Sequence, residues 1–146
     1  MSNRILSYRG LLTDGAQDTI LLSTKKGEVG YRITKFETIG ETPGVSNQES
    51  VTKIWKEQQA TVDGIINFSD NRLLAAAVTT TSVDQEDFPL NNAIIFDQEI
   101  VNQDIYVTHK DVKTGESTNY YIELEVIKLS EDQAMVATLK DIRYNS

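Results

Sequence analysis

Cysteine is absent from this 146-residue sequence, and proline, tryptophan and histidine are scarce, with two, one and one copies. Without cysteine, neither disulfide bonds nor thiolate metal sites can stabilise the fold. The single histidine, His109, rules out a histidine-rich zinc site and leaves one candidate base for a catalytic relay. No run of about 18 apolar residues is present, so we expect no membrane span. The N-terminus lacks the apolar segment of a signal peptide.

Excess positive charge is also lacking. The formal net charge is −8, and residues 1–60 carry a balance of +1 whereas residues 61–146 carry −9. A protein that follows a nucleic-acid backbone needs a cationic surface to displace counterions, so we expect no nucleic-acid partner. The asymmetry fits a neutral half that docks and an acidic half that faces outward, and ordinary acidic solubility explains it equally well.

Catalytic motifs are missing as well. The sequence has no phosphate-binding loop, no dinucleotide-binding glycine pattern and no nucleophile-elbow serine. Nothing motif-like surrounds His109, which favours a packed histidine over a catalytic base. Glu123 and Glu125 lie about 6.6 Å apart along one strand face, a possible separation for paired acids, but such alternation is typical of a solubilising surface. Other acidic groups lack the spacing of a calcium loop and are interpreted as solvated: Asp14, Asp18, Asp84, Glu86 and Asp87. We therefore expect no enzymatic activity, cofactor or metal.

The C-terminal third alternates apolar and polar residues with a period of two, in segments 104–112, 118–129 and 134–144. A turn at Thr114-Gly115 would pair the first two segments, and a loop at 130–133 the last two. The predicted register then places Ile105 opposite Leu124, Val107 opposite Ile122 and His109 opposite Tyr120. Because one apolar face continues across all three segments, the sequence predicts an antiparallel meander. Its outer face would carry Tyr121, Glu123, Glu125, Thr138 and Lys140.

Further strands are predicted upstream, at residues 18–24, 28–40 and 91–101. In the second of these, strict alternation would place Val29, Tyr31, Ile33 and Lys35 on one face.

Two segments are ambiguous. In residues 46–60, Ser46 and Glu49 have the spacing of a capping box, which slightly favours a short helix over a strand. Residues 64–82 fit either a hairpin or a strand followed by a helix, and the β-formers at its end favour the hairpin. About eight strands without βαβ alternation predict an all-β fold, an antiparallel β-sandwich or jelly roll with at most one short helix. We expect a single domain over residues 1–146.

Aromatic residues offer the clearest functional indication. In the predicted meander, Tyr106 and Tyr121 fall on the same outer face. Large amphipathic rings at such positions are typical of interface anchors, and cross-strand support of a solvated sheet is the alternative.

Four stretches together resemble the small virion structural proteins of tailed bacteriophages: residues 6–20, 27–44, 94–111 and 119–143. The resemblance implies an all-β capsid decoration (cement) protein or minor head or tail component that forms homo-oligomers. Its partner would be the major capsid protein or another virion protein, on a particle assembled in the host cytoplasm. Residues 1–18 are then a candidate extended docking segment, because its two arginines could meet acidic capsid groups. The candidate docking residues within it are Arg4, Ile5, Leu6, Tyr8 and Arg9. The alternative is a carbohydrate- or receptor-binding module of a phage tail or fibre, with Trp55 and tyrosines as stacking platforms.

Overall fold

The computed structural model describes residues 4–22, 28–43, 45, 47–80 and 91–129. Every regular element in these segments is a β-strand. The strands are β1 (Ile5–Leu12), β2 (Gln17–Ile20), β3 (Val29–Gly40), β4 (Glu49–Trp55), β5 (Leu73–Thr80), β6 (Asn91–Phe96), β7 (Ile105–Asp111) and β8 (Thr118–Lys128).

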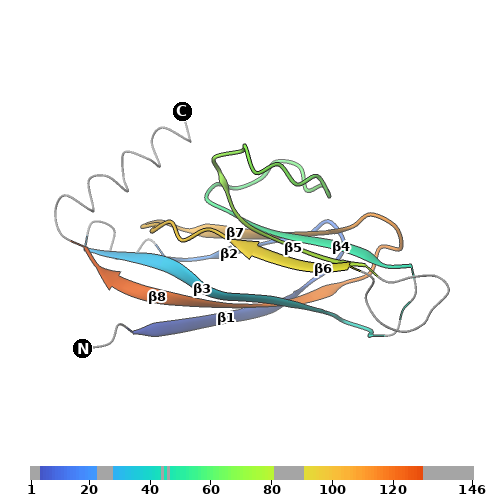
Figure 1. Cartoon of the computed structure of the whole chain (residues 1–146), viewed down its shortest axis with the longest axis horizontal. Coiled ribbons are helices and arrows are strands. Elements are labelled where there is room, and N and C mark those ends of the chain that lie inside the picture. Colours follow the sequence, from blue (N-terminus) through green and yellow to red (C-terminus); the bar gives the residue numbers. More distant parts are fainter. Residues whose placement is uncertain (1–3, 23–27, 44, 46, 81–90, 130–146) are drawn as a thin grey trace.

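These strands form two antiparallel sheets that lie face to face (Figure 1). One sheet has three strands in the order β1-β8-β3, and the other has five in the order β2-β7-β4-β5-β6. The predicted all-β sandwich is therefore confirmed. The helix slightly favoured within residues 46–60 is wrong, because β4 occupies this segment.

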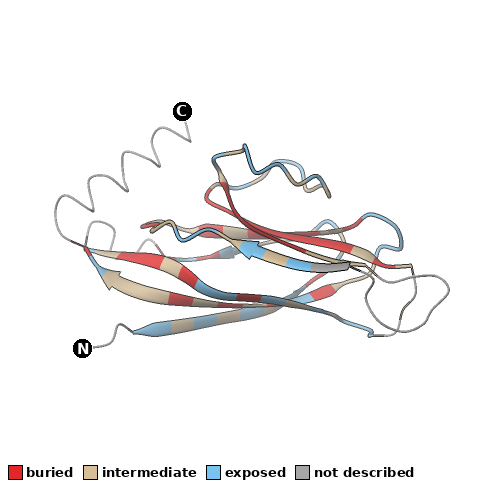
Figure 2. Cartoon of the chain, in the orientation of Figure 1, coloured by how far each residue is buried: buried red, intermediate tan, exposed pale blue. Residues whose placement is uncertain are grey.

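The core lies between the two sheets. Buried residues occur on strands of both sheets (Figure 2). Ile105 and Val107 of β7 meet Ile122 and Leu124 of β8 there, and all four side chains are fully buried. Alternation along both strands produces this core, because successive side chains point to opposite faces of a sheet. Burial of large aliphatic side chains contributes roughly 1.5–3 kcal/mol each, so this layer dominates the stability of the fold.

The predicted meander is wrong in its pairing, although the inward and outward faces predicted for its first two strands are right. β7 pairs with β2 and β4, whereas β8 pairs with β1 and β3, so the two strands belong to different sheets. The chain crosses the sandwich at Thr114-Gly115, where Gly115 has the positive φ of 74° that the turn requires. Alternation shows which side of a strand is buried, but it is the same for a hairpin partner and for a partner in the facing sheet. The third predicted strand of the meander, residues 134–144, lies outside the described residues.

A bulge in β3 changes the predicted face of that strand. The register against β8 shifts between Ile33 and Lys35, so that Thr34 becomes an extra residue. Tyr31, Ile33 and Phe36 point inward, whereas Lys35 is exposed and does not share the face of Ile33. An extra residue in one strand reverses the parity of everything after it, which strict alternation could not predict.

β4 resembled a helix because both of its faces are buried. Thr52 and Ile54 point into the sandwich, and Lys53 and Trp55 point to the other side, where residues 56–72 cover them. The expected hairpin within residues 64–82 is half right. Its second half is β5, but β5 pairs with β4 and β6, and residues 64–72 belong to the covering loop.

Candidate interaction surfaces

The predicted docking residues near the N-terminus form part of a sheet. Residues 5–12 are the edge strand β1, paired along its whole length with β8. Leu6 and Tyr8 pack against the core, whereas Ile5 and Arg9 are exposed on the outer side. Arg4 is exposed, and its carbonyl accepts a hydrogen bond from the Val126 amide at 2.7 Å. The side chains that remain available for docking are those of Arg4, Ile5 and Arg9.

Tyr106 and Tyr121 do not share a face, which corrects the expectation. Tyr106 lies on β7 opposite Trp55 and Thr19, on the outer side of the five-stranded sheet. Tyr121 lies on β8 opposite Arg9, on the outer side of the three-stranded sheet. The error follows directly from the wrong pairing of the meander, because two strands in different sheets have outer faces on opposite sides of the sandwich.

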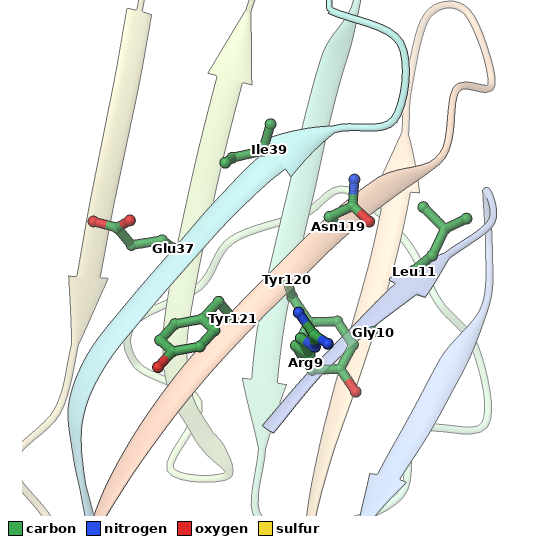
Figure 3. Close-up of a pocket in the computed structure, with 8 residues that line it drawn as sticks. All are labelled: Arg9, Gly10, Leu11, Glu37, Ile39, Asn119, Tyr120 and Tyr121. Carbon is green, nitrogen blue, oxygen red and sulfur yellow. The ribbon is translucent and has the colours of Figure 1, made fainter. Parts of the chain in front are cut away.

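The first candidate surface is the outer side of the three-stranded sheet near Tyr121, called here the three-stranded face. It contains a shallow depression of about 600 Å³ (Figure 3). Two cross-strand rows of side chains line the depression. The first row is Arg9, Tyr121 and Glu37, and the second is Leu11, Asn119 and Ile39. Leu11 and Ile39 are 44% and 64% exposed. The surface thus has a charged and aromatic row beside a row with two exposed aliphatic side chains.

Outward side chains of β8 in and beside the Tyr121 row have local partners in the same sheet. Arg32 and Glu125 form an ion pair across β3 and β8. The Tyr121 hydroxyl donates a hydrogen bond to Oε2 of Glu123 at 2.7 Å, and this bond raises the pKa of Tyr121 above its ordinary value. Nζ of Lys35 lies 5.9 Å from the centroid of the Tyr121 ring. These contacts leave the Tyr121 ring fixed between its two cross-strand neighbours.

Beneath the depression, Tyr120 connects the two sheets. Its hydroxyl donates to Oδ2 of Asp18 at 2.9 Å, and burial together with this bond raises the pKa of Tyr120. The ring passes close to Gly10, where an added Cβ would lie only 2.9 Å from Cε2 of Tyr120. Glycine at this position therefore gives the ring room to reach Asp18.

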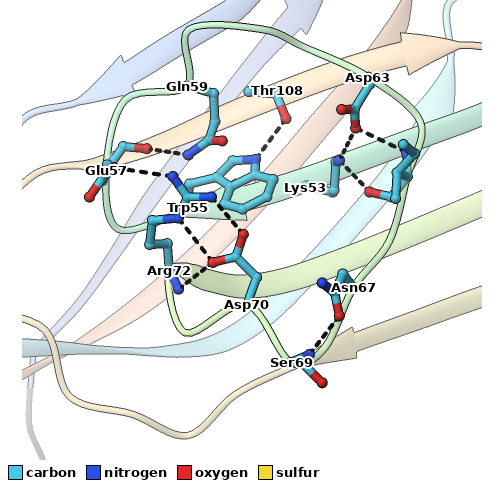
Figure 4. Close-up of polar contacts among 11 residues, drawn as sticks. Lys53, Trp55, Glu57, Gln59, Asp63, Asn67, Ser69, Asp70, Arg72 and Thr108 are labelled. Atoms are coloured by element: carbon cyan, nitrogen blue, oxygen red, sulfur yellow. Dashed lines mark hydrogen bonds and ion pairs between the residues drawn. The ribbon is translucent and has the colours of Figure 1, made fainter. Parts of the chain in front are cut away.

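The second candidate surface is the β4–β5 loop, residues 56–72, which lies over the outer side of the five-stranded sheet (Figure 4). Lys53 and Trp55 beneath it are only 2% and 7% exposed. Nε1 of Trp55 donates to Oγ1 of Thr108 at 3.0 Å. The loop closes at its neck, where the Lys56 amide donates to the carbonyl of Arg72 at 2.8 Å.

Ion pairs and hydrogen bonds brace this loop. Nζ of Lys53 donates to Oδ1 of Asp63 at 3.0 Å and to the carbonyl of Ile65 at 2.6 Å. The hydrogen bond from Lys53 lowers the pKa of Asp63, and the hydrogen bond from Arg72 lowers that of Asp70. Nζ of Lys53 lies 5.0 Å from the centroid of the Trp55 ring, and the Arg72 guanidinium lies 5.8 Å from it. The indole is therefore flanked by two cations whose charges are paired with loop carboxylates.

The loop presents two apolar side chains to solvent. Ile65 is 68% exposed and Phe68 is 64% exposed. Phe68 lies within a turn at residues 67–70. This turn is ordered by hydrogen bonds from the Ser69 amide to Oδ1 of Asn67 and from the Asp70 amide to the Asn67 carbonyl. Large apolar groups on a braced loop can bind without the cost of ordering the loop backbone, which is typical of interface anchors.

The groups weighed for catalysis have structural partners. His109 is fully buried, with Nε2 at 2.8 Å from the Glu116 carbonyl and Nδ1 at 3.5 Å from Oγ1 of Thr52. Glu123 and Glu125 are engaged by Tyr121 and Arg32 as described above. Within the described segments, no group of three or more histidine or acidic side chains is placed to hold a metal. Asp84, Glu86 and Asp87 lie outside those segments.

Comparisons with known proteins leave the family open. No family model matches the sequence, and no curated protein matches it. One similar structure is that of Bacillus endospore appendages, which form disulfide-linked pili. It has 10% identity and a TM-score of 0.37, over 89% of this chain and 93% of that chain. Another is the Yersinia pseudotuberculosis-derived mitogen, with 11% identity and a TM-score of 0.38, over 89% and 92%. Likenesses this weak carry no functional argument. Across the described residues, no helix is long and apolar enough to cross a membrane.

Sequence reasoning missed Ile65 and Phe68, because it assigned residues 64–82 to a hairpin. A signal was present: apolar residues in a stretch that also contains glycine, asparagine and aspartate, the composition of a loop. Sequence reasoning also missed that the β4–β5 loop covers Trp55. A tryptophan in an amphipathic segment does not indicate which face of the sheet a following loop will cover.

Proposed function

We propose that this protein is a non-enzymatic structural component of a bacteriophage virion that binds the capsid, as a decoration protein does, through the tip of the β4–β5 loop. The observation that carries the proposal is the exposure of Ile65 and Phe68 on a loop braced by two ion pairs, one of them from the buried Lys53. The virion context comes from the sequence resemblance described above.

Bracing matters because association costs conformational freedom. Ordering a side chain at an interface costs about 0.5–1.5 kcal/mol, and a mobile loop adds the cost of its backbone. Here Lys53 already holds the loop from beneath through Asp63, and Arg72 at the end of the loop holds Asp70. Burial of an apolar side chain of this size contributes roughly 1.5–3 kcal/mol, so two such anchors supply a useful affinity when contacts repeat by symmetry over a particle.

The proposal is tested by co-sedimentation with capsids of the phage that encodes the protein. We expect the double variant Ile65→Ser/Phe68→Ser to lower the apparent affinity at least tenfold without lowering the melting temperature. Leu21→Ser is the matched control, since Leu21 is 71% exposed but lies outside the loop. Equal occupancy by the loop variant and the wild type would refute the proposed docking site.

The N-terminal candidates need point variants. Deleting residues 1–10 would remove most of β1 and leave one edge of β8 unpaired, so a loss of binding could reflect unfolding. Arg4→Ser/Ile5→Ser leaves the inward-facing side chains of β1 in place. A loss of particle binding in this variant, with the loop variant unaffected, would move the docking site to the N-terminal segment.

The carbohydrate-binding alternative loses Trp55 as a stacking platform but retains Tyr121. Trp55 is covered by the loop and cannot stack on a sugar. Tyr121 lies in the depression beside Arg9, Glu37 and Asn119, whose polar groups suit sugar hydroxyls. A glycan array separates the two functions, because saturable sugar binding that is lost in Tyr121→Ser would favour the alternative.

A further inference from the structure

We propose that the three-stranded face binds the same face of a second copy of this chain, around a two-fold axis that runs along β8. This surface lies on the opposite side of the sandwich from the β4–β5 loop, so the inference goes beyond capsid docking and does not depend on it.

The first step is the arrangement of charge around Tyr121. Arg9 and Glu37 stand on the two strands that flank β8, one on each side of Tyr121 (Figure 3). Two strand spacings of about 4.8 Å separate their backbones, and the Tyr121 ring lies between them. Within the described segments neither residue takes part in an ion pair, unlike Arg32 and Glu125 in the same sheet. The Tyr121 row therefore presents one positive and one negative group at equal distances from the central strand of the face.

The second step is the symmetry operation. Rotation by 180° about an axis along β8 exchanges the two sides of the face and keeps the position along the strands. β1 of the second copy then lies over β3 of the first, so Arg9 of each copy meets Glu37 of the other. In the next row the same rotation places Leu11 over Ile39, and the exposed aliphatic side chains cover each other. Tyr121 lies on the axis and meets its own copy.

The charges select this axis over its alternative. A two-fold axis across the strands through the same row would place Arg9 over Arg9 and Glu37 over Glu37, and like charges repel. In the Tyr121 row, an axis along β8 forms two opposite-charge pairs and one aromatic contact at the centre. Glu123 and Glu125 also lie along this axis, where the Tyr121 hydroxyl and Arg32 of their own sheet partner them. Contacts made by the same patch on both copies are the ordinary form of a two-fold dimer.

Dimensions fit a weak dimer. Packed sheets lie about 10 Å apart with strands within about 30° of each other, which an arginine and a glutamate can span. Three strands and the eight residues of β1 give a footprint of roughly 14 by 26 Å. That is smaller than the ~800 Å² per partner of a standard interface. We therefore expect dissociation at low protein concentration and in high salt, since screening weakens exposed ion pairs.

Charge reversal gives a test that a simple loss of folding cannot imitate. By sedimentation velocity at low salt over a range of concentrations, the wild type should form a dimer, and Arg9→Glu or Glu37→Arg alone should weaken it at least tenfold. Each single variant brings like charges together twice. An equimolar mixture of the two single variants should form a heterodimer, because every contact in it is again between opposite charges. The double variant Arg9→Glu/Glu37→Arg should dimerise as the wild type does.

Matched controls reverse charges at the last residue of β8 and at the residue that precedes β3. Lys128→Glu and Glu28→Lys carry the same changes in net charge at the far ends of these strands, and we expect both to keep the dimer. A monomeric wild type at every concentration, or single variants that fail to pair when mixed, would overturn the proposal. Capsid binding by a monomeric wild type would reject the dimer and leave the proposed function intact. Saturable glycan binding at Tyr121 would assign the face to a sugar instead.

Discussion

Asp111 shows how one carboxylate can direct the chain from one sheet to the other. Its Oδ1 accepts hydrogen bonds from the amides of Lys113 and Thr114, and its Oδ2 accepts from the Thr114 hydroxyl and the Glu116 amide. The amide of Glu49 on β4 also donates to Oδ1, at 3.2 Å. The side chain is only 3% exposed. Burial by itself would raise the pKa of Asp111, but the hydroxyl and amide donors outweigh it and hold the pKa far below its ordinary value.

We expect Asp111→Asn to destabilise the protein by about 2–3 kcal/mol at neutral pH, since an amide cannot accept on both sides of the group. The depressed pKa gives this loss a pH dependence. Below the ordinary aspartate pKa of about 3.9 the unfolded chain binds the proton first, so the wild-type advantage is complete above that value and declines as pH falls toward the folded pKa. Denaturant unfolding of both proteins from pH 7 to pH 2 measures the difference. Thr114→Ala, which removes one donor, should show a smaller loss, and a difference that stays constant down to pH 2 would contradict this account.

At the scale of elements, the β4–β5 loop depends on a lysine that the sequence presents as a surface residue. Lys53 is 2% exposed, whereas the side chain of its partner Asp63 is 48% exposed. The lysine thus holds the loop from the buried end of the pair. Its ammonium group lies over the Trp55 ring and reaches the Ile65 carbonyl, next to the proposed docking tip.

Lys53→Met keeps most of the buried volume and removes these polar contacts. We expect the unfolding free energy to fall by about 1–2 kcal/mol. Amide hydrogen exchange should accelerate at least tenfold in residues 57–71, while the β4 and β7 amides stay protected, because local opening follows local contacts. Asp63→Asn is the control, since its amide oxygen can still accept from Lys53, and its effect should be smaller. Unchanged exchange in the loop of the methionine variant would show that the loop is held in another way.

The sequence could predict the faces of strands but not their partners. In β8 the alternation assigned Tyr120, Ile122 and Leu124 to the core correctly, since burial of one face imposes that period. It could not distinguish a β7–β8 hairpin from a crossover, because the turn at Gly115 serves both. The buried Lys53 also made β4 difficult to predict as a strand. A charged residue among apolar ones indicates an amphipathic element, whereas β4 is covered on both faces. Of the candidate sites, Arg9 and Tyr121 were identified from the sequence, but Glu37 joined them only through sheet order.

At the scale of the whole molecule, the two proposed surfaces point in opposite directions. The three-stranded face and the β4–β5 loop lie on the two outer sides of one sandwich (Figure 1). Pairing two copies through their three-stranded faces buries those faces at the centre and leaves one loop on each outer side. Such a dimer cannot place both loops on one flat surface. It is suited to connect two surfaces that face each other, such as neighbouring capsid projections.

A bridging dimer and a monomeric binder predict different behaviour with purified particles. Because each dimer has two loops on opposite sides, the wild type should connect particles at intermediate ratios, and dynamic light scattering should detect larger species that disappear at excess protein. Glu37→Arg should still bind, because its loop is intact, but it should leave the particle radius unchanged. The double variant Arg9→Glu/Glu37→Arg restores opposite charges across the axis and should restore bridging. Ile65→Ser/Phe68→Ser should dimerise without binding, so neither bridging nor occupancy should occur. Bridging by the monomeric Glu37→Arg protein would mean that one chain carries two capsid-binding surfaces, and the division of roles between loop and sheet face would then be wrong.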